Sequence, residues 1–180
     1  MKKTKQRRNI IMYSSMSGNT QEVAELIRDR LEENGELTFL IRLQHDGQFI
    51  HEDFVAMNKF YSDGIVAGEE TRCWLGTYTW GQGDVPDEWV YACSTYNDFL
   101  VKWETRVFGT GDTQFGGDKL FCSATEEITD ILVSGSVSVL GSPLKIEQSP
   151  RGSQEQKVKD WVDQDWEELW EEELRKIQED

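Results

Sequence analysis

Short apolar segments alternate with longer stretches of helical periodicity along almost the whole chain, and this alternation limits the fold more than any other feature. Strand-like segments lie at 9–13, 37–43, 73–76 (with 65–67 as a competing position), 106–109, and 137–140 with 144–147, bent at 141–143. Amphipathic segments lie at 23–34, 51–60, 87–100, 118–134 and from 153 onward. Parallel strands need crossovers of a dozen or more residues, usually helices. The pattern therefore predicts an α/β domain, a parallel sheet with helices on both faces.

The last amphipathic segment is unusually long and acidic. The spacing of Ser153 to Gln156 is that of a capping box, and apolar positions recur at helical period up to Ile177. One continuous helix of about 25 residues would be about 37 Å long, more than a five-stranded sheet of this size needs. We expect a single domain over 1–180, with a basic N-terminal tail at 1–8. Residues 163–180 are expected to extend the last helix, packing on the core or contacting a partner or second copy.

The charge balance excludes several classes of function. The chain carries 19 Lys and Arg against 34 Asp and Glu, a formal net charge of −15. Such a surface repels nucleic acid and anionic lipid and favours partners with a basic face. The apolar stretch 10–13 behind the basic tail is too short for a signal peptide, and no run is long enough to cross a membrane. Three scattered cysteines without a CxxC pair indicate a reduced cytoplasmic protein with no metal site.

A loop of small hydroxyl residues joins the first strand to the first helix, in the segment IMYSSMSGNT at 11–20. Backbone N–H groups and the positive dipole end at a helix N-terminus can hold a phosphate. Ser15, Ser17 and Thr20 add hydroxyl groups, and Gly18 lets the backbone approach closely. The loop has neither the lysine of a Walker loop nor the dinucleotide glycine pattern. An ordinary capped turn between strand and helix is the alternative.

Two further glycine-rich loops follow the third and fourth strands, at 75–89 and 107–115. Each carries an aromatic side chain, Trp80 or Phe115, on which a planar ring could stack. In an open parallel sheet, ligands bind outside the carboxyl ends of the strands. Either aromatic taken alone is more typical of packing. The three loops together predict one ligand site.

With these motifs the sequence resembles the flavodoxins over nearly its whole length, up to about Val162. The pattern Tyr13-x-Ser15-x-x-Gly18-x-Thr20-x-x-x-Ala24-x-x-Ile27 is similar to the family's FMN phosphate loop. Residues 77–86 are similar to its first flavin-ring loop, and 108–112 with 121–122 to its second. The resemblance is to the short-chain branch. It implies a three-layer α/β/α sandwich with a five-stranded parallel sheet of order 2-1-3-4-5, non-covalent FMN and low-potential one-electron transfer.

The resemblance also implies which residues bind the cofactor. They are Ser15, Met16, Ser17, Gly18, Asn19 and Thr20 at the phosphate, Thr77, Tyr78, Thr79, Trp80 and Gly81 in the first ring loop, and Gly109, Thr110, Gly111, Asp112, Phe115 and Cys122 in the second. Trp80 and Phe115 would enclose the ring, although the family usually has tyrosine in the place of Phe115. Gly81 would allow the 80–81 peptide to turn over on flavin reduction, because glycine adopts positive φ at little cost.

The implied function is that of an electron carrier with no catalytic residues of its own. It would act as a monomer that binds a basic-faced reductase and acceptor redox enzymes transiently. Two alternatives stay open: a flavodoxin-fold enzyme, such as a quinone reductase or a ribonucleotide-reductase-activating flavoprotein, and a binding module without FMN. No nucleophile–base spacing indicates catalysis. His45 and His51 are expected to be solvated and far from the three loops.

Overall fold

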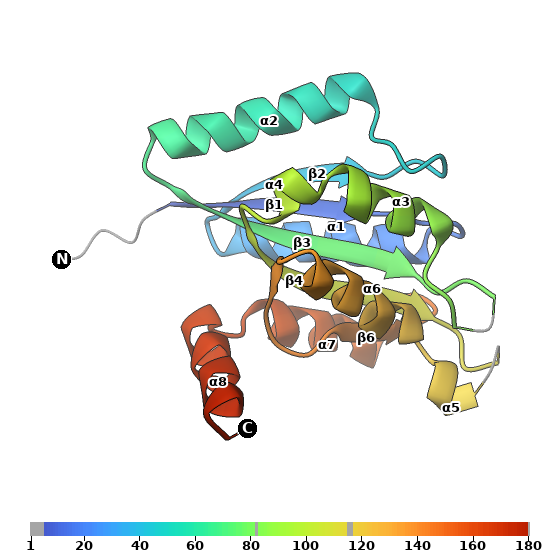
Figure 1. Cartoon of the computed structure of the whole chain (residues 1–180). Coiled ribbons are helices and arrows are strands. Elements are labelled where there is room, and N and C mark those ends of the chain that lie inside the picture. Colours follow the sequence, from blue (N-terminus) through green and yellow to red (C-terminus); the bar gives the residue numbers. More distant parts are fainter. Residues whose placement is uncertain (1–5, 82, 115–116, 180) are drawn as a thin grey trace.

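The computed structural model describes residues 6–179 except Gln82 and residues 115–116, and it has the expected layered α/β arrangement (Figure 1). The strands are β1 (Arg7–Tyr13), β2 (Leu37–Arg42), β3 (Glu70–Tyr78), β4 (Glu104–Gly111), β5 (Ser138–Val139) and β6 (Leu144–Glu147). The helices are α1 (Asn19–Glu33), α2 (His51–Val66), α3 (Asp87–Thr95), α4 (Asn97–Leu100), α5 (Gly117–Leu120), α6 (Ser123–Ser134), α7 (Ser153–Val162) and α8 (Trp166–Glu179).

The sheet is parallel, with the strand order β2-β1-β3-β4-β5. β6 also pairs with β4, in a register that places Leu144 beside Phe108, whereas β5 places Val139 beside Thr105. The bent fifth strand is therefore confirmed as two short pieces along one neighbour. The predicted fold class and strand order are confirmed as well.

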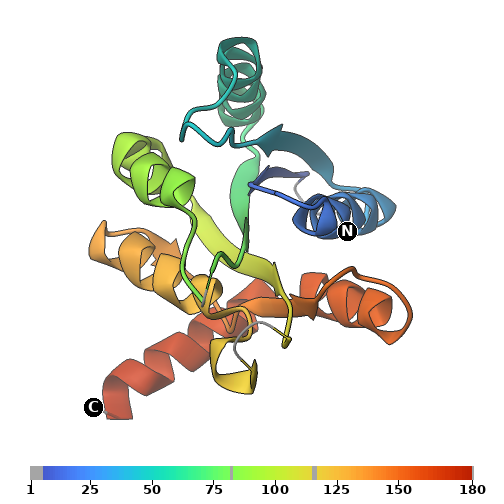
Figure 2. The same cartoon turned by 90° about the vertical axis from the view of Figure 1, so that its right-hand side faces the viewer.

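Strict alternation along the strands builds a separate core on each face of the sheet. In β1, Ile10 and Met12 belong to the core under α2, α3, α4 and α6. Ile11 and Tyr13 belong to the opposite core under α1 and α7. Looking along the strands, Figure 2 shows these two groups of helices on the two faces. Because both faces are covered, the loops at the strand ends are left to form a binding site.

The second helix is longer than predicted, since α2 continues beyond residue 60 to Val66. Residues 65–67 therefore do not form a strand. Val66 is 90% exposed and buries almost no apolar surface, whereas Cys73 and Trp74 in β3 are buried on opposite faces. The third strand belongs where both of its faces can be covered, and this contact pattern is not visible in a short apolar run.

Two of the predicted helices are interrupted. The segment 87–100 divides at Tyr96, whose ring packs against Phe49 and Phe54 with centroids 4.9 and 5.3 Å away. The segment 118–134 divides before Ser123, because Cys122 has a left-handed backbone with φ of 52°. A break of one or two residues hardly changes the apolar periodicity, so the sequence pattern continues through it.

The N-terminal tail is shorter than predicted. Arg7 and Arg8 belong to β1, and the Nη1 of Arg8 donates to the carbonyl of Phe60 at 3.0 Å while its Nε donates to Glu69 at 2.5 Å. Residues 1–5 lie outside the described part of the chain. The basic character of this segment is thus partly used in anchoring the first strand to the end of α2.

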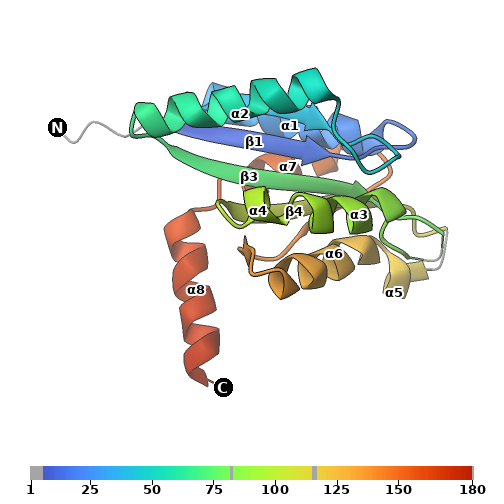
Figure 3. The same cartoon turned by 45° about the horizontal axis from the view of Figure 1, so that its top comes forward.

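The continuous last helix is also wrong, because the chain turns between α7 and α8. Asp163 accepts hydrogen bonds from Arg30 in α1, and the Oδ1 of Asp165 accepts from the amide of Glu167 at 2.8 Å at the start of α8. Figures 1 and 3 show α8 running away from the sheet. The capping box is wrong too, since the N-cap of α7 is Gly152 and no side chain caps that helix.

The first half of α8 rests on the core through its tryptophans. Trp166 is buried and stacks under the Arg72 guanidinium at 4.4 Å, and the Nε1 of Trp170 donates to Glu104 at 2.8 Å. Leu174 and Ile177, further along, are exposed. Core packing is therefore confirmed for the start of α8, and contact of its far end with a partner stays a prediction.

One tryptophan of β3 packs against both C-terminal helices, α7 and α8. Trp74 is buried, and its ring meets Trp161 of α7 and Trp166 of α8 edge-on, with centroids 5.4 and 5.2 Å away. Its Nε1 donates to the Oδ1 of Asn9 at 2.9 Å. The sheet, α7 and α8 therefore share a single aromatic cluster.

A buried arginine of β4 ties the same region together. The Nη1 of Arg106 donates to the Trp161 carbonyl at 2.7 Å, and its Nη2 donates to the Oε1 of Gln164 at 2.8 Å. Its Nε donates to the Leu140 carbonyl at 3.3 Å. Within the described residues no carboxylate pairs with it, and burial lowers the pKa of Arg106 to about 10. The guanidinium thus joins the end of α7 to the bend between β5 and β6.

Candidate functional site

The loops at the carboxyl edge of the sheet enclose a cavity of about 800 Å³. Ten of the residues selected from the sequence line it: Met16, Ser17, Asn19, Tyr78, Thr79, Trp80, Gly81, Thr110, Gly111 and Asp112. They come from the segments after β1, β3 and β4, as predicted from the position of those loops. This volume is typical of a site for a small molecule or cofactor.

One end of the cavity is the start of α1, and it has no side-chain cap. Gly18 is the N-cap with φ of 94°, and the Oγ of Ser15 accepts from the Gly18 amide at 3.1 Å. The first helical bond runs from the Glu22 amide to the Gly18 carbonyl, so within the described residues the amides of 19–21 have no acceptor. Free amides at a helix N-terminus suit an anion. The start of α1 therefore differs from an ordinary capped turn, the alternative considered from the sequence.

Two hydrogen bonds hold the loop between β1 and α1 in place. The hydroxyls of Thr20 and Thr110 lie 2.8 Å apart and are buried, which joins the loop to the end of β4. The Nη2 of Arg42, at the end of β2, donates to the carbonyl of Ser15 at 3.0 Å. Ser15, Gly18 and Thr20 thus support the loop and do not line the cavity. Arg42 was not selected from the sequence.

The other end of the cavity carries an exposed indole. Trp80 is 53% exposed and begins a tight turn, in which its amide donates to the Asp84 carbonyl at 2.9 Å. The ring of Tyr78 meets it edge-on with centroids 6.4 Å apart. The Oγ1 of Thr79, a residue of the cavity wall, is buried and has no hydrogen-bond partner among the residues that the structure describes. A planar ligand can stack on the exposed indole at this end of the cavity.

Gly81 is already in the left-handed region, with φ of 54°. The backbone of the turn from Trp80 to Asp84 therefore favours a glycine at this position in the structure as it stands. A peptide that turns over on flavin reduction stays a prediction. The buried Thr77 is not among the residues that line the cavity, and its hydroxyl donates to the Tyr78 carbonyl at 2.8 Å.

The segment after β4 contributes Thr110, Gly111 and Asp112 to the cavity, whereas Gly109 and Cys122 lie behind it. A Cβ on Gly109 would meet the Cγ2 of Thr125 at 2.4 Å. Burial raises the pKa of the Cys122 thiol to about 12, so this cysteine is not a nucleophile. Phe115 lies outside the described residues, and its stacking on a ring stays a prediction.

Four lining residues were missed by sequence reasoning. They are Leu120 of α5 and Gln148, Ser149 and Arg151 of the loop after β6. The Gln148 amide donates to the Gly111 carbonyl at 2.8 Å, which joins this loop to the end of β4. The rule that ligands bind at the carboxyl ends of strands, applied to the fifth strand as well, would have identified this loop.

A buried carboxylate connects the loops at this edge. The Oε1 of Glu88, at the start of α3, accepts from the hydroxyl of Ser14 at 2.7 Å and that of Tyr78 at 2.6 Å. The Nδ1 of His45 lies 3.2 Å from the same oxygen. His45 was expected to be far from the ligand loops, and this is wrong. Burial acts to raise the pKa of Glu88, but these hydrogen bonds outweigh it and hold that pKa below its ordinary value.

We expect Glu88→Gln to make stability less dependent on pH. A carboxyl with a depressed folded-state pKa stabilises the fold above the unfolded value of 4.5, and this contribution is lost as the pH falls through the folded value. The variant should be less stable than wild type at pH 7, and the difference should shrink as the pH falls below 4.5 toward the lower folded-state pKa. Urea unfolding at a series of pH values measures it. Glu52→Gln, in the exposed first turn of α2, is the control for loss of one charge. A difference that does not change with pH would contradict this prediction.

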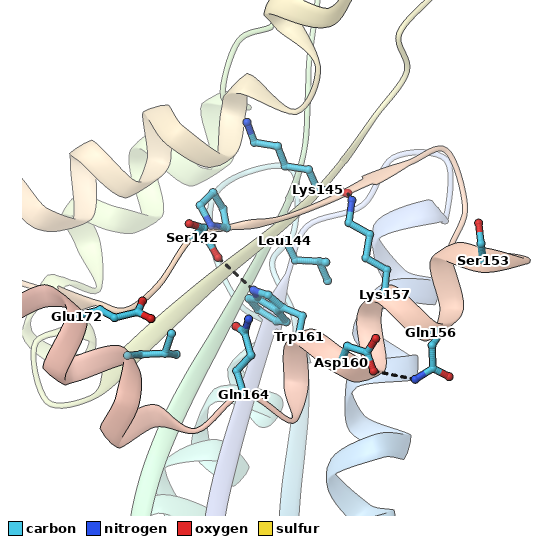
Figure 4. A pocket seen from close by; sticks show the side chains of 12 residues that line it. Ser142, Leu144, Lys145, Ser153, Gln156, Lys157, Asp160, Trp161, Gln164 and Glu172 are labelled. Atoms are coloured by element: carbon cyan, nitrogen blue, oxygen red, sulfur yellow. Dashed lines mark hydrogen bonds between the residues drawn. The ribbon is translucent and has the colours of Figure 1, made fainter.

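A second cavity of about 670 Å³ lies between β6, α7 and α8 (Figure 4). Figure 4 shows the indole N–H of Trp161 bonded to the Ser142 carbonyl, at 3.1 Å, and Gln156 bonded to Asp160. Its wall carries charges of both signs, from Lys145, Lys157, Asp160 and Glu172. Within the described residues no group of three or more His, Cys, Asp or Glu could hold a metal ion. None of the loops selected from the sequence reaches this cavity.

The chain matches known proteins along most of its length. The family model described as Flavodoxin matches residues 62–161. Probable flavodoxin 2 of Bacillus subtilis is 28% identical over 83% of this chain and 87% of its own. Probable flavodoxin 1 of the same organism is 30% identical over 78% of each chain. The crystal structure of oxidised flavodoxin 2 from Bacillus cereus superposes with a TM-score of 0.61, at 27% identity over 86% of this chain and 94% of that one.

Proposed function

Because the chain belongs to the flavodoxin family, we propose that it is a low-potential one-electron carrier that uses non-covalently bound FMN. The observation that carries the proposal is the two-ended cavity. Within the described residues, helix amides without an acceptor lie at one end of it, and the exposed indole of Trp80 lies at the other. A flavin with a phosphate tail has the matching two ends. Riboflavin lacks the anionic tail.

The protein residues have distinct tasks in this proposal. Ser17, Asn19 and the free amides of α1 would hold the phosphate, and Trp80 would stack on the ring. FMN supplies the electron transfer itself. The chain contributes binding, orientation and the dielectric surroundings of the ring. Burial raises the pKa of the Cys122 thiol and so favours its unreactive protonated form.

The proposed partners are a basic-faced reductase and acceptor redox enzymes, bound transiently by a monomer. The net charge of −15 supports steering toward basic surfaces. Trp80 is exposed, so a partner could approach a flavin that stacks on it. The three cysteines are free and buried, which agrees with a reduced cytoplasmic protein. Among the described residues, none of the helices has the length and apolar character of a membrane span.

The cofactor identity tests the proposal directly. The purified protein is expected to be yellow, and the flavin released by denaturation should have the mass of FMN, bound one to one. Protein stripped of its cofactor should bind added FMN. Trp80→Ala should bind FMN more weakly, because the stacking of the flavin ring on the indole is lost. An adenine-containing cofactor, or wild-type protein with no affinity for any flavin, would refute the assignment.

A further inference from the structure

One cation lies on the wall of the cavity. Arg151 follows β6 and lines the same cavity as Ser17 and Asn19 of the loop before α1. The Nη2 of Arg151 lies 3.7 Å from the Oε1 of Glu22, which belongs to the first turn of α1. The guanidinium therefore reaches the helix end that carries the free amides.

The side chain of Arg151 is held only loosely. It is 80% exposed, and its single ion pair in the described residues, to Glu22, is longer than a hydrogen bond. Exposed pairs of this length contribute little to stability. Arg151 can therefore leave Glu22 for a more strongly charged group at small cost.

The backbone under Arg151, in contrast, is well anchored. The amide of Arg151 donates to the Ser149 carbonyl at 2.8 Å, and the Nε2 of Gln154 donates to the same carbonyl at 2.9 Å. Pro150, between Ser149 and Arg151, is buried. The backbone of Arg151 is thus held in place, while its exposed side chain can change partners.

No other side chain lining the described part of the cavity is positively charged. Asp112, which does line it, is held by the Nε2 of Gln148 at 3.2 Å. Arg42 is nearby but is already bonded to the Ser15 carbonyl. A dianion at the start of α1 would therefore find its charged ligand in Arg151.

We propose that Arg151 binds the phosphate of the flavin, exchanging its contact with Glu22 for the dianion, and so selects FMN over riboflavin. A guanidinium can donate two parallel hydrogen bonds to phosphate oxygens. The free amides of α1 and Arg151 would then hold the phosphate from two sides. This inference rests on the proposed function, since it needs a flavin in the cavity.

Titration of the stripped protein with FMN and with riboflavin tests the role of Arg151, with flavin fluorescence as the readout. Arg151→Gln should weaken FMN binding about tenfold, which corresponds to about 1.4 kcal/mol. Riboflavin binding should be unchanged, and the salt dependence of FMN binding should decrease. Arg175→Gln on α8 is the matched control, because it removes the same charge from an exposed arginine whose side chain, among the described residues, bonds only to the Glu171 carbonyl of its own helix. It should change neither affinity.

A second variant separates charge from loop damage. Glu22→Gln frees Arg151 and should tighten FMN binding, and this gain should be smaller when Arg151→Gln is also present. Equal FMN affinity in Arg151→Gln and Arg175→Gln, or an equal loss of FMN and riboflavin, would overturn the inference and leave the proposed function standing. A wild-type protein that binds neither flavin would instead refute the proposed function.

Discussion

Arg106→Ala is expected to lower the free energy of unfolding by about 3–5 kcal/mol. The variant leaves the buried Leu140 carbonyl without its side-chain donor and removes the shorter of the two hydrogen bonds to the Trp161 carbonyl, and a buried unsatisfied group costs about 1–3 kcal/mol. It also opens a cavity under the Trp161 ring, which lies 4.1 Å from the guanidinium carbon. Urea unfolding followed by far-ultraviolet circular dichroism measures the loss.

Arg106→Lys is the informative control. It keeps a cation in β4 but cannot reproduce the fork that reaches Leu140, Trp161 and Gln164 together. Its stability should fall between wild type and alanine. A loss of less than about 1 kcal/mol in Arg106→Ala would show that the hydrogen bonds of the buried guanidinium do not stabilise the fold.

Trp74→Ala should also cost about 3–5 kcal/mol, the usual loss for a large aromatic side chain removed from a core. Trp74 is 1% exposed and contacts both Trp161 and Trp166, so the substitution removes the shared support of α7 and α8. We expect those helices to become less protected than the rest of the fold. Urea unfolding gives the global loss, and amide hydrogen exchange locates it.

Two other substitutions define what the Trp74 result means. Trp74→Phe also leaves the Oδ1 of Asn9 without its donor, but it keeps most of the ring contacts. It should therefore lose less stability than Trp74→Ala. Trp80→Ala removes the same side chain from a half-exposed loop and should leave stability nearly unchanged. Similar losses for Trp74→Ala and Trp80→Ala would show that burial in the aromatic cluster is not what stabilises the protein.

The fold was largely predictable because its signals are local. Alternation in β1 assigns Ile10 and Ile11 to opposite faces, and period-3.6 spacing in α1 assigns Val23 and Ile27 to one face. The turn of α8 was not predictable in the same way. Asp163 bonds to Arg30, 133 residues earlier in the chain, and such a contact leaves no periodicity in the sequence.

The candidate site was predictable as three loops but not as a set of contacts. Small hydroxyl residues after β1 and an aromatic after β3 follow from the chemistry that a phosphate and a ring require. Whether Thr20 faces the cavity or bonds to Thr110 depends on how closely β4 approaches α1. The cofactor-binding residues therefore stay a prediction.

The sequence by itself determined the order of the elements, the two-sided sheet and the edge at which a ligand would bind, because each follows from residue type and spacing within a short segment. Only the tertiary structure decided that His45 meets Glu88, 43 residues away, and that Arg151 meets the first turn of α1. These side chains lie in loops without periodicity. Their neighbours are set by where parallel strands end in space, since every strand of such a sheet brings its carboxyl end to the same edge.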